Sequence, residues 1–233
     1  VLNVPIIRQG EKVLLGVQEA KGIDYYIINT ETDEMFLLTS ADDLNITMSK
    51  FSDKAVFLKE GRVTLYDFVK REFRAAQNAS LTSPVISPNG TWIAAEIEGG
   101  DAQPYTSRLR RIRPSDMKDF TLVNMQNDLI RNPRPVWSPD SRYLLFFLSD
   151  PPEQNKSWTG IYVLDLLDFK LYEGPAVSET GKHVAALSIN DMLAYSAKDG
   201  AEVYLSAPNL EKAKKVYETG KQDMLGYDNE TVD

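Results

Sequence analysis

The chain has 233 residues, no cysteine and a formal net charge of −8. The absence of cysteine excludes disulfide bonds, a thiolate nucleophile and cysteine-ligated metals. The acidic balance argues against general nucleic-acid binding, which needs a basic surface, and no run of 18 apolar residues predicts a membrane span. The chain begins at Val1 without a methionine, which leaves open the removal of a signal peptide or lipid anchor.

A short pattern occurs twice, about 50 residues apart, and organises the rest of the chain. Its two copies are Ile86-Ser87-Pro88-Asn89-Gly90 and Trp137-Ser138-Pro139-Asp140-Ser141, each between two apolar runs. Proline, asparagine, aspartate and glycine favour a tight turn, and a serine hydroxyl can cap it. Each copy therefore predicts a β-hairpin, and these residues are expected to be structural.

Weaker copies of the hairpin extend the pattern in both directions. The predicted turns fall at Gly10, Asp53, Asn89, Asp140 and Asn190. A short apolar strand follows each turn, over 13–17, 55–58, 92–95, 143–147 and 192–195. Alternating third strands are expected at 24–29, 62–67, 160–165 and 202–206, with fourth strands after them.

Four strands per unit at this period predict an all-β fold, a β-propeller with five four-stranded blades. An incomplete six-bladed propeller is the alternative. The predicted propeller covers 1–220, with blades at about 1–41, 42–80, 81–132, 133–181 and 182–220. Residues 221–233 are expected to form a tail or a ring-closing strand.

The hairpin resembles the repeat of the TolB-like, WD-like propellers, whose pattern is a Trp-Ser-Pro-Asp-Gly turn followed by an apolar strand. The units at Asn89 and Asp140 match this pattern well, and the other three keep only its spacing and hydrophobicity. The resemblance implies a binding module exported to the bacterial periplasm or cell surface, with a cytoplasmic location as the alternative. It names a superfamily rather than an activity, because propellers serve many functions.

The residues that could carry catalysis are sparse. A hydrolase would need a nucleophile, a base and an orienting group, yet His183 is the only histidine and no Gly-x-Ser-x-Gly sequence occurs. The carboxylates of Asp42, Asp43, Asp150 and Glu153 lie in predicted loops but lack the spacing of a calcium loop. We therefore expect no catalytic residue, no metal and no cofactor.

Two features are candidates for binding. The stretch from Arg108 to Arg113, with arginines at 108, 110, 111 and 113, is basic in an acidic chain and falls on the predicted third strand of the middle blade. The two longest insertions, 98–106 and 149–159, carry the amphipathic side chains of Tyr105 and Trp158. Each feature also has a structural interpretation: arginines can cover apolar neighbours on a strand, and each aromatic ring can pack on its own blade.

The predicted function is a non-enzymatic propeller that binds a protein partner, with a polysaccharide as the alternative ligand. Its predicted binding residues are Tyr105, Arg108, Arg110, Arg111, Arg113 and Trp158. We expect a monomer that binds no nucleic acid and has no membrane span. Two other interpretations stay open: a carbohydrate-active or metal-binding enzyme that uses the central channel, and the propeller lobe of a larger protein.

Overall fold

The computed structural model describes residues 6–9, 12–19, 22–41, 46–97, 106–126, 129–149, 159–178, 186–189, 192–198 and 201–218. These residues form strands and turns, and none of them is helical. Within this part of the chain there is accordingly no helix long and apolar enough to cross a membrane.

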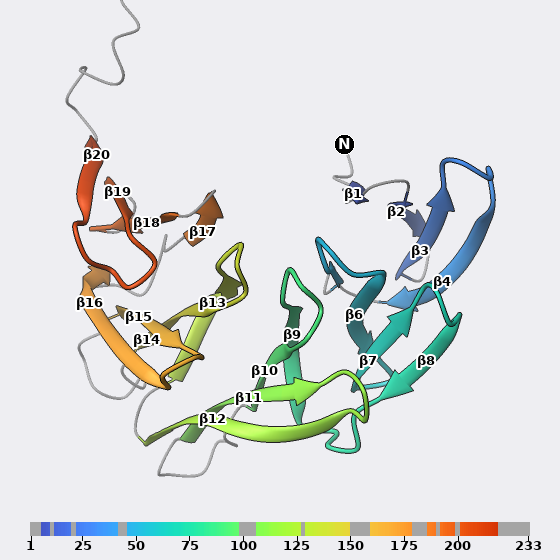
Figure 1. The fold of residues 1–233 in the computed structure, drawn as a ribbon, viewed down its shortest axis with the longest axis horizontal. Coiled ribbons are helices and arrows are strands. Elements are labelled where there is room, and N and C mark those ends of the chain that lie inside the picture. The colour runs from blue at the N-terminus through green and yellow to red at the C-terminus, as the bar shows by residue number, and fades with distance from the viewer. Residues whose placement is uncertain are drawn as a thin grey trace, which may run out of the picture. The chain divides into compact units, whose positions relative to one another are not determined.

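The strands form five antiparallel sheets, and each sheet consists of four strands that follow one another along the chain (Figure 1). The first contains β1 (Ile6–Gln9), β2 (Lys12–Glu19), β3 (Gly22–Asn29) and β4 (Met35–Ala41). The second contains β5 (Thr47–Met48), β6 (Lys54–Lys59), β7 (Arg62–Asp67) and β8 (Glu72–Ala75). The third contains β9 (Leu81–Ile86), β10 (Ile93–Ile97), β11 (Thr106–Arg113) and β12 (Lys118–Gln126).

The fourth sheet contains β13 (Leu129–Trp137), β14 (Tyr143–Ser149), β15 (Thr159–Asp165) and β16 (Lys170–Ser178). The fifth contains β17 (Ala186–Ile189), β18 (Met192–Ala197), β19 (Glu202–Ser206) and β20 (Lys214–Glu218). Successive four-stranded meanders are the blades of a β-propeller, so the predicted all-β propeller is confirmed, and the described residues form five four-stranded blades. The domain limits stay a prediction, and the tail 221–233 lies outside the described residues.

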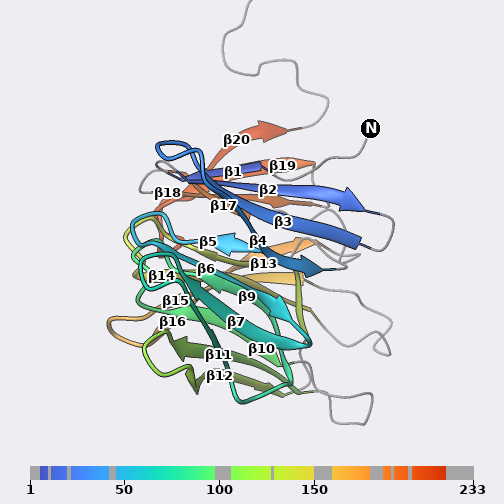
Figure 2. The same ribbon diagram turned by 90° about the vertical axis from the view of Figure 1, so that its right-hand side faces the viewer.

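The chain divides into two compact units. One contains Val1–Gly100 and Ser107–Asn124, and the other contains Asp101–Thr106 and Met125–Asp233. In the first unit, the sheet β5–β8 lies between the sheets β1–β4 and β9–β12, as Figures 1 and 2 both show. The second unit contains the sheets β13–β16 and β17–β20.

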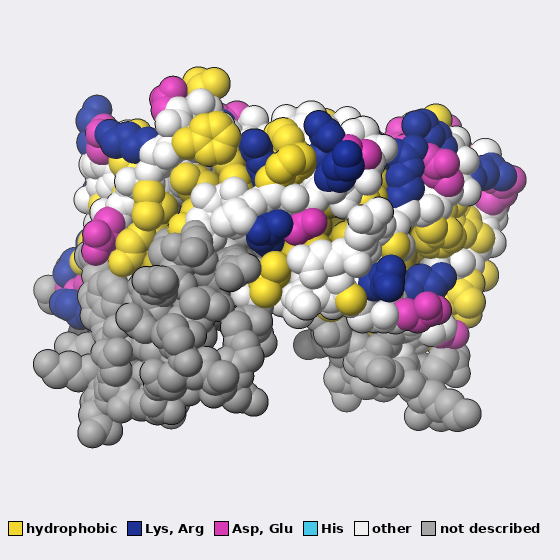
Figure 3. All heavy atoms as spheres, turned by 90° about the horizontal axis from the view of Figure 1, so that it is seen from below, with side chains coloured by type: hydrophobic (Ala, Val, Ile, Leu, Met, Phe, Trp, Pro, Cys, Tyr) yellow, Lys and Arg dark blue, Asp and Glu magenta, His cyan; other side chains and the backbone are white. Residues whose placement is uncertain are grey.

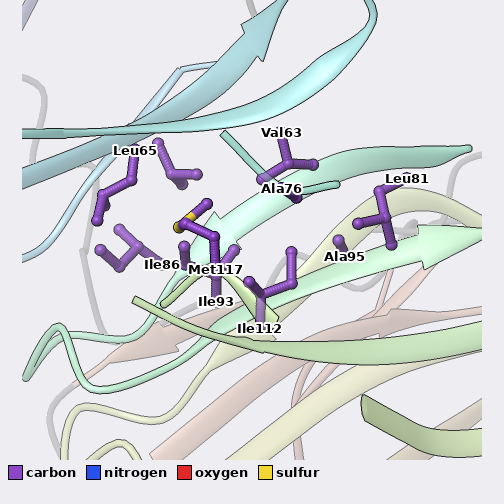
Figure 4. Close-up of a cluster of buried hydrophobic side chains, with 10 residues drawn as sticks. Val63, Leu65, Ala76, Leu81, Ile86, Ile93, Ala95, Ile112 and Met117 are labelled. Carbon is purple, nitrogen blue, oxygen red and sulfur yellow. The ribbon is translucent and has the colours of Figure 1, made fainter. Parts of the chain in front are cut away.

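The sheet β5–β8 is apolar on both of its faces because successive strand residues point to opposite sides. Val56 and Leu65 belong to a cluster shared with the sheet β9–β12, whereas their neighbours Phe57 and Tyr66 belong to a cluster shared with β1–β4. Figure 4 shows the first cluster, with Leu65 and Ile93 among the side chains gathered between the two sheets. Full burial of each such side chain stabilises the fold by about 1.5–3 kcal/mol.

The second unit has a core built in the same way. Leu145 and Phe147 of β14 pack with Leu193 and Tyr195 of β18 in one buried cluster. The ring of Tyr195 stacks on the ring of Tyr204, with 5.5 Å between the ring centroids. The continuous apolar runs of the second strands β14 and β18 therefore serve the packing of one sheet on the next.

The repeated serine turns have the same hydrogen bonds in both copies. The amide of Ser87 donates to the carbonyl of Trp92 at 2.8 Å, and that of Ser138 donates to the carbonyl of Tyr143 at 2.9 Å. Each serine hydroxyl also donates to the following Asn89 or Asp140 side chain, at 2.9 and 2.5 Å. The predicted role of these residues as turn builders is thus confirmed.

The structure shifts one of the predicted turn alignments. The amide of Ser49 donates to the carbonyl of Lys54 at 3.0 Å, which makes Ser49 the equivalent of Ser87 and Ser138. Asp53 therefore corresponds to Thr91, rather than to Asn89 as the sequence alignment predicts. The predicted alignment is wrong here because this turn lacks the Ser-Pro pair, and its aspartate follows Lys50, Phe51 and Ser52, whereas Asn89 directly follows Pro88.

Gly90 is required in its turn for two reasons. Its φ of +68° lies in the left-handed region. A Cβ atom at this position would also lie 1.8 Å from Oγ and 2.6 Å from Cβ of Ser52 in the neighbouring sheet. The absence of a side chain at Gly90 therefore lets the two turns pack against each other.

We therefore expect Gly90→Ala to destabilise the protein more than Gly61→Ala. Gly61 has a similar φ of +70°, but a Cβ atom added to it would have no neighbouring atom within 4 Å. Gly61→Ala should cost about 1 kcal/mol from backbone strain alone, and Gly90→Ala should cost about 1–3 kcal/mol more from the clash. Urea unfolding of the two variants measures the difference, and equal losses would contradict the proposed contact with Ser52.

A buried glutamate anchors the last described sheet. Glu202 is 1% exposed, and its carboxylate accepts hydrogen bonds from Lys198 at 2.8 Å, Lys215 at 3.1 Å and the Tyr204 hydroxyl at 2.8 Å. These bonds, that of Lys198 foremost, lower the pKa of Glu202 from 4.5 to about 2. A carboxyl whose pKa is lower in the folded protein stabilises the fold above its unfolded pKa, and this stabilisation is lost as the pH falls.

The contribution of Glu202 should accordingly disappear as the pH falls from 4.5 to about 2. Glu202→Gln should unfold more easily than the wild type at neutral pH and should lose less further stability on acidification. Thermal unfolding at neutral pH and at successive values below 4.5 measures this difference. Glu60→Gln, which alters an exposed glutamate in the turn after β6, is the control and should follow the wild type.

Candidate functional site

A pocket of about 370 Å³ opens between the first two sheets of the first unit. We call it the aromatic pocket; its lining residues are Lys12, Ile27, Asn29, Glu34, Met35, Phe36, Tyr66, Phe68 and Arg71. They come from the start of β2, the end of β3, the turn between β3 and β4, the start of β4, the end of β7 and the turn that follows β7. A largely apolar concavity of this size with a few polar groups is typical of a binding site.

Tyr66 is the centre of the aromatic lining. Its ring lies 5.6 Å from the ring of Phe36 and 5.1 Å from the ring of Phe68, measured between centroids. Its side chain lies in a buried position at the end of β7, and this burial raises the pKa of its phenol although Arg71 acts in the opposite direction. The phenol therefore stays protonated at neutral pH and is available as a hydrogen-bond donor.

Charged side chains surround the aromatic rings in opposite-sign pairs. The ammonium of Lys12 lies 2.5 Å from the carboxylate of Asp53, so this pair links the first sheet to the turn of the second. Arg71 and Glu34 approach within 3.5 Å, and both are largely exposed. Because each positive charge has a carboxylate nearby, the aromatic pocket is close to neutral and favours an apolar ligand.

A second pocket lies at the equivalent position between the sheets β5–β8 and β9–β12. It has a volume of about 390 Å³, and we call it the basic pocket. Its lining residues are Lys54, Asp67, Lys70, Arg74, Gly90, Thr91, Arg113, Pro114 and Ser115. Four of these side chains are cationic and one is a carboxylate.

The strand register explains why the two pockets are equivalent. Lys12 at the start of β2 pairs with Asn29 at the end of β3, and Lys54 at the start of β6 pairs with Asp67 at the end of β7. The side chains of Asn29 and Asp67 both accept hydrogen bonds from backbone amides of the turn that follows. The same framework thus forms both pockets, and the other side chains decide their chemistry.

The predicted basic stretch lies on β11, the third strand of its sheet, as expected. Alternation along the strand separates its arginines onto opposite faces. Arg110 donates to Asp119 through two nitrogen atoms, at 3.0 and 2.6 Å, and Arg113 donates to Asp116 at 3.0 and 2.5 Å. The hydrogen bonds from Arg113 lower the pKa of the Asp116 carboxyl to about 2.

The charge of β11 is therefore partly neutralised by carboxylates that follow it in the chain. Figure 3 shows the same intermixing on one face, where basic side chains lie beside acidic ones. The role of Arg110, Arg111 and Arg113 in binding stays a prediction. Tyr105, Trp158 and the side chain of Arg108 lie outside the described residues.

The structure also places aromatic rings against the arginines, which the sequence analysis missed. The guanidinium of Arg111 lies 4.5 Å from the ring centroid of Trp92 and 5.8 Å from that of Phe120. Trp92 precedes β10 and Phe120 lies on β12, so neither ring is close to Arg111 in the chain. The contact with Trp92 could have been predicted only from the antiparallel pairing of β10 and β11, in which Ala94, close to Trp92 in the chain, lies opposite Arg111.

The described residues contain no group of three or more acidic, histidine or cysteine side chains able to hold a metal ion. His183 and the predicted loop carboxylates Asp42, Asp43, Asp150 and Glu153 lie outside the described part of the chain. Both pockets of the first unit are lined by described residues, so the structure defines their chemistry.

The electrostatic contrast between the pockets predicts that two equivalent substitutions change the free energy of unfolding differently. Lys12→Gln should lower the free energy of unfolding by up to about 1 kcal/mol, because it removes the ion pair with Asp53. Lys54→Gln should leave it unchanged or raise it, because a charge is removed beside other cations. Urea unfolding at low salt measures both effects, and added salt should reduce the difference. A loss at Lys54 equal to that at Lys12 would contradict this description of the basic pocket.

No family model matches the chain, and no curated protein matches it in sequence. Solved structures do match it in fold. Dipeptidyl peptidase 4 from Porphyromonas gingivalis has a TM-score of 0.65 and 11% identity, over 94% of this chain and 40% of the peptidase chain. TolB from Acinetobacter baumannii has a TM-score of 0.55 and 15% identity, over 88% of this chain and 52% of TolB.

A chain in the structure of a nidogen–laminin complex has a TM-score of 0.54 and 12% identity, over 87% of this chain and 74% of that one. This chain thus spans about two fifths of the peptidase and about half of TolB. Identities this low show a shared fold and leave activity open. The chain has a TolB-like β-propeller fold, as its repeated serine turn predicts.

Proposed function

We propose that this protein is a non-enzymatic binding propeller whose aromatic pocket and adjoining strand β4 hold an extended segment of a protein partner. The observation that carries the proposal is the exposed apolar surface of β4 beside the pocket. Met35, Phe36 and Leu37 are 61%, 39% and 51% exposed. Three consecutive exposed apolar residues on one strand are unusual for a surface that contacts only water.

The position of β4 supports an extended ligand. β4 is at the end of the strand order β1-β2-β3-β4, so within the described residues its backbone pairs on one side only. An edge of this kind can pair with a strand from another chain, with side chains filling the pockets beside it. Phe36 links the two features because it lies on β4 and also lines the aromatic pocket.

The other fourth strands carry features that discourage such pairing. Each begins with a charged residue, namely Glu72 of β8, Lys118 of β12, Lys170 of β16 and Lys214 of β20. Charges on an edge strand oppose pairing with another chain. β4, by contrast, has the sequence MFLLTSA without a charge. The unprotected strand is thus the one that adjoins the aromatic pocket.

Two further observations are consistent with a binding role. The nidogen–laminin structure contains a chain of similar fold in a protein–protein complex. The aromatic pocket is lined by a tyrosine and two phenylalanines, and aromatic side chains commonly contribute most of the affinity of a protein interface. Location in the bacterial envelope is a further part of the proposal, which rests on the resemblance of the repeat to TolB-type propellers.

Peptides that bind at this site should depend on Leu37 and Phe36. We expect peptides selected from a random library to contain an apolar or aromatic anchor and to bind Leu37→Lys and Phe36→Ala at least about tenfold more weakly than the wild type. Leu167→Lys is the matched control, because Leu167 is 69% exposed but lies in the turn after β15. Fluorescence anisotropy with labelled peptides measures the affinities.

Two results would contradict the proposal. Selected peptides could bind Leu37→Lys as tightly as the wild type, which would place their site elsewhere. Selection could also yield no peptide that prefers the wild type over Leu37→Lys, which would exclude this surface as a peptide site. Circular dichroism of each variant confirms that the fold is retained.

A further inference from the structure

The basic pocket gathers positive charge from two neighbouring sheets. Lys54 lies at the start of β6, Lys70 in the turn after β7, Arg74 on β8 and Arg113 at the end of β11. Their convergence is a local exception in a chain with a net charge of −8. A concave site with one sign of charge attracts ligands of the opposite sign.

Lys54 lacks the ion pair that its equivalent makes. In the aromatic pocket, Lys12 is neutralised by Asp53 from the turn of the following sheet. The residue equivalent to Asp53 in the next turn is Thr91, which lines the basic pocket and carries no charge. Among the described residues, no carboxylate lies within 4.0 Å of the Lys54 ammonium group, and the same holds for Lys70.

The one carboxylate in the lining is already engaged by its own turn. An oxygen of Asp67 accepts hydrogen bonds from the amides of Val69 and Lys70, both at 3.1 Å. Asp67 is also buried, at 8% exposure. Its carboxylate therefore stabilises the turn after β7, while the two lysines remain without a partner of opposite charge in the described structure.

The two guanidinium groups are held in place by local hydrogen bonds. Arg74 donates to the carbonyls of Pro114 and Ser115 at 3.2 and 3.1 Å, which joins β8 to the turn after β11. Its other terminal nitrogen donates to Glu72, and Arg113 donates to Asp116. These contacts partly neutralise the guanidinium groups but also fix their positions, which reduces the entropic cost of binding.

We propose that the basic pocket binds a phosphate group. Phosphate is a compact anion with several oxygen acceptors, which matches ammonium and guanidinium donors that surround one concavity of about 390 Å³. The hydroxyl-bearing Ser115 lies in the same lining and adds a neutral donor. The lysines supply point charges and the arginines supply oriented donors.

This site is separate from β4 and the aromatic pocket. It lies between the sheets β5–β8 and β9–β12, and it shares no lining residue with the aromatic pocket. The ligand could be inorganic phosphate or a phosphorylated side chain of a protein. The chemistry that recognises the two is shared, so the test compares them directly.

The experiment is an amide NMR titration of the full chain at constant ionic strength, with inorganic phosphate in one series and N-acetyl-phosphoserine amide in the other. We expect saturable shifts at the amides of Lys70, Gly90 and Ser115, which border the pocket. Lys54→Gln should weaken binding about tenfold, because it removes a charged hydrogen-bond donor. Lys12→Gln is the matched control and should leave the affinity unchanged, since Lys12 occupies the equivalent position with an ionic partner.

Tighter binding of the phosphoserine compound would identify a phosphorylated side chain as the ligand, and equal or weaker binding would identify free phosphate. Shifts that sodium chloride reproduces, or that do not saturate, would overturn the proposal. An unchanged affinity of Lys54→Gln would also overturn it. None of these results depends on the peptide site at β4, so the two proposals fail separately.

Discussion

The burial of both faces of the inner strands is the constraint on which this structure depends. In the sheet β5–β8, Val56 and Phe57 are neighbours in the chain but belong to hydrophobic clusters on opposite sides of the sheet. Neither face is left for a solvent-exposed catalytic surface, since each packs against another sheet. The residues that this sheet contributes to the two pockets accordingly lie near strand ends, in turns and on the edge strand β8.

A contact between successive turns borders the basic pocket of the first unit. The carbonyl of Pro88 accepts hydrogen bonds from the amide of Phe51 and the hydroxyl of Ser49, both at 2.7 Å. Gly90 lies against Ser52 at the same junction because it has no side chain. The two pockets lie at equivalent positions in the first unit, and the side chains that differ between them determine their chemistry. Asp53 forms an ion pair with Lys12, whereas Thr91 at the equivalent position has no charge to pair with Lys54.

Much of the fold could be predicted from local patterns. The apolar runs at 55–58, 143–147 and 192–195 became the second strands β6, β14 and β18, because short apolar runs bounded by turn residues fit the buried pleated surface of a sheet. The turn at Ser138 was also predictable, because proline and aspartate restrict the backbone locally. The predicted equivalence of Asp53 and Asn89 was wrong, because the hydrogen bond of Ser49 defines the position of this turn and an aspartate alone does not.

The sites were less predictable, since each is assembled from residues that are distant in the chain. Arg111 contacts Trp92 and Phe120, and the aromatic pocket joins Phe36 of β4 to Tyr66 of β7. The arginine pattern favoured a binding surface on β11, which stays a prediction, and only the structure shows that Asp119 and Asp116 pair with Arg110 and Arg113. By itself the sequence determined the repeat, the strands and their serine turns, because these depend on interactions within a few residues. Only the tertiary structure decided which charges are paired and where the pockets lie, because those depend on side chains brought together from neighbouring sheets.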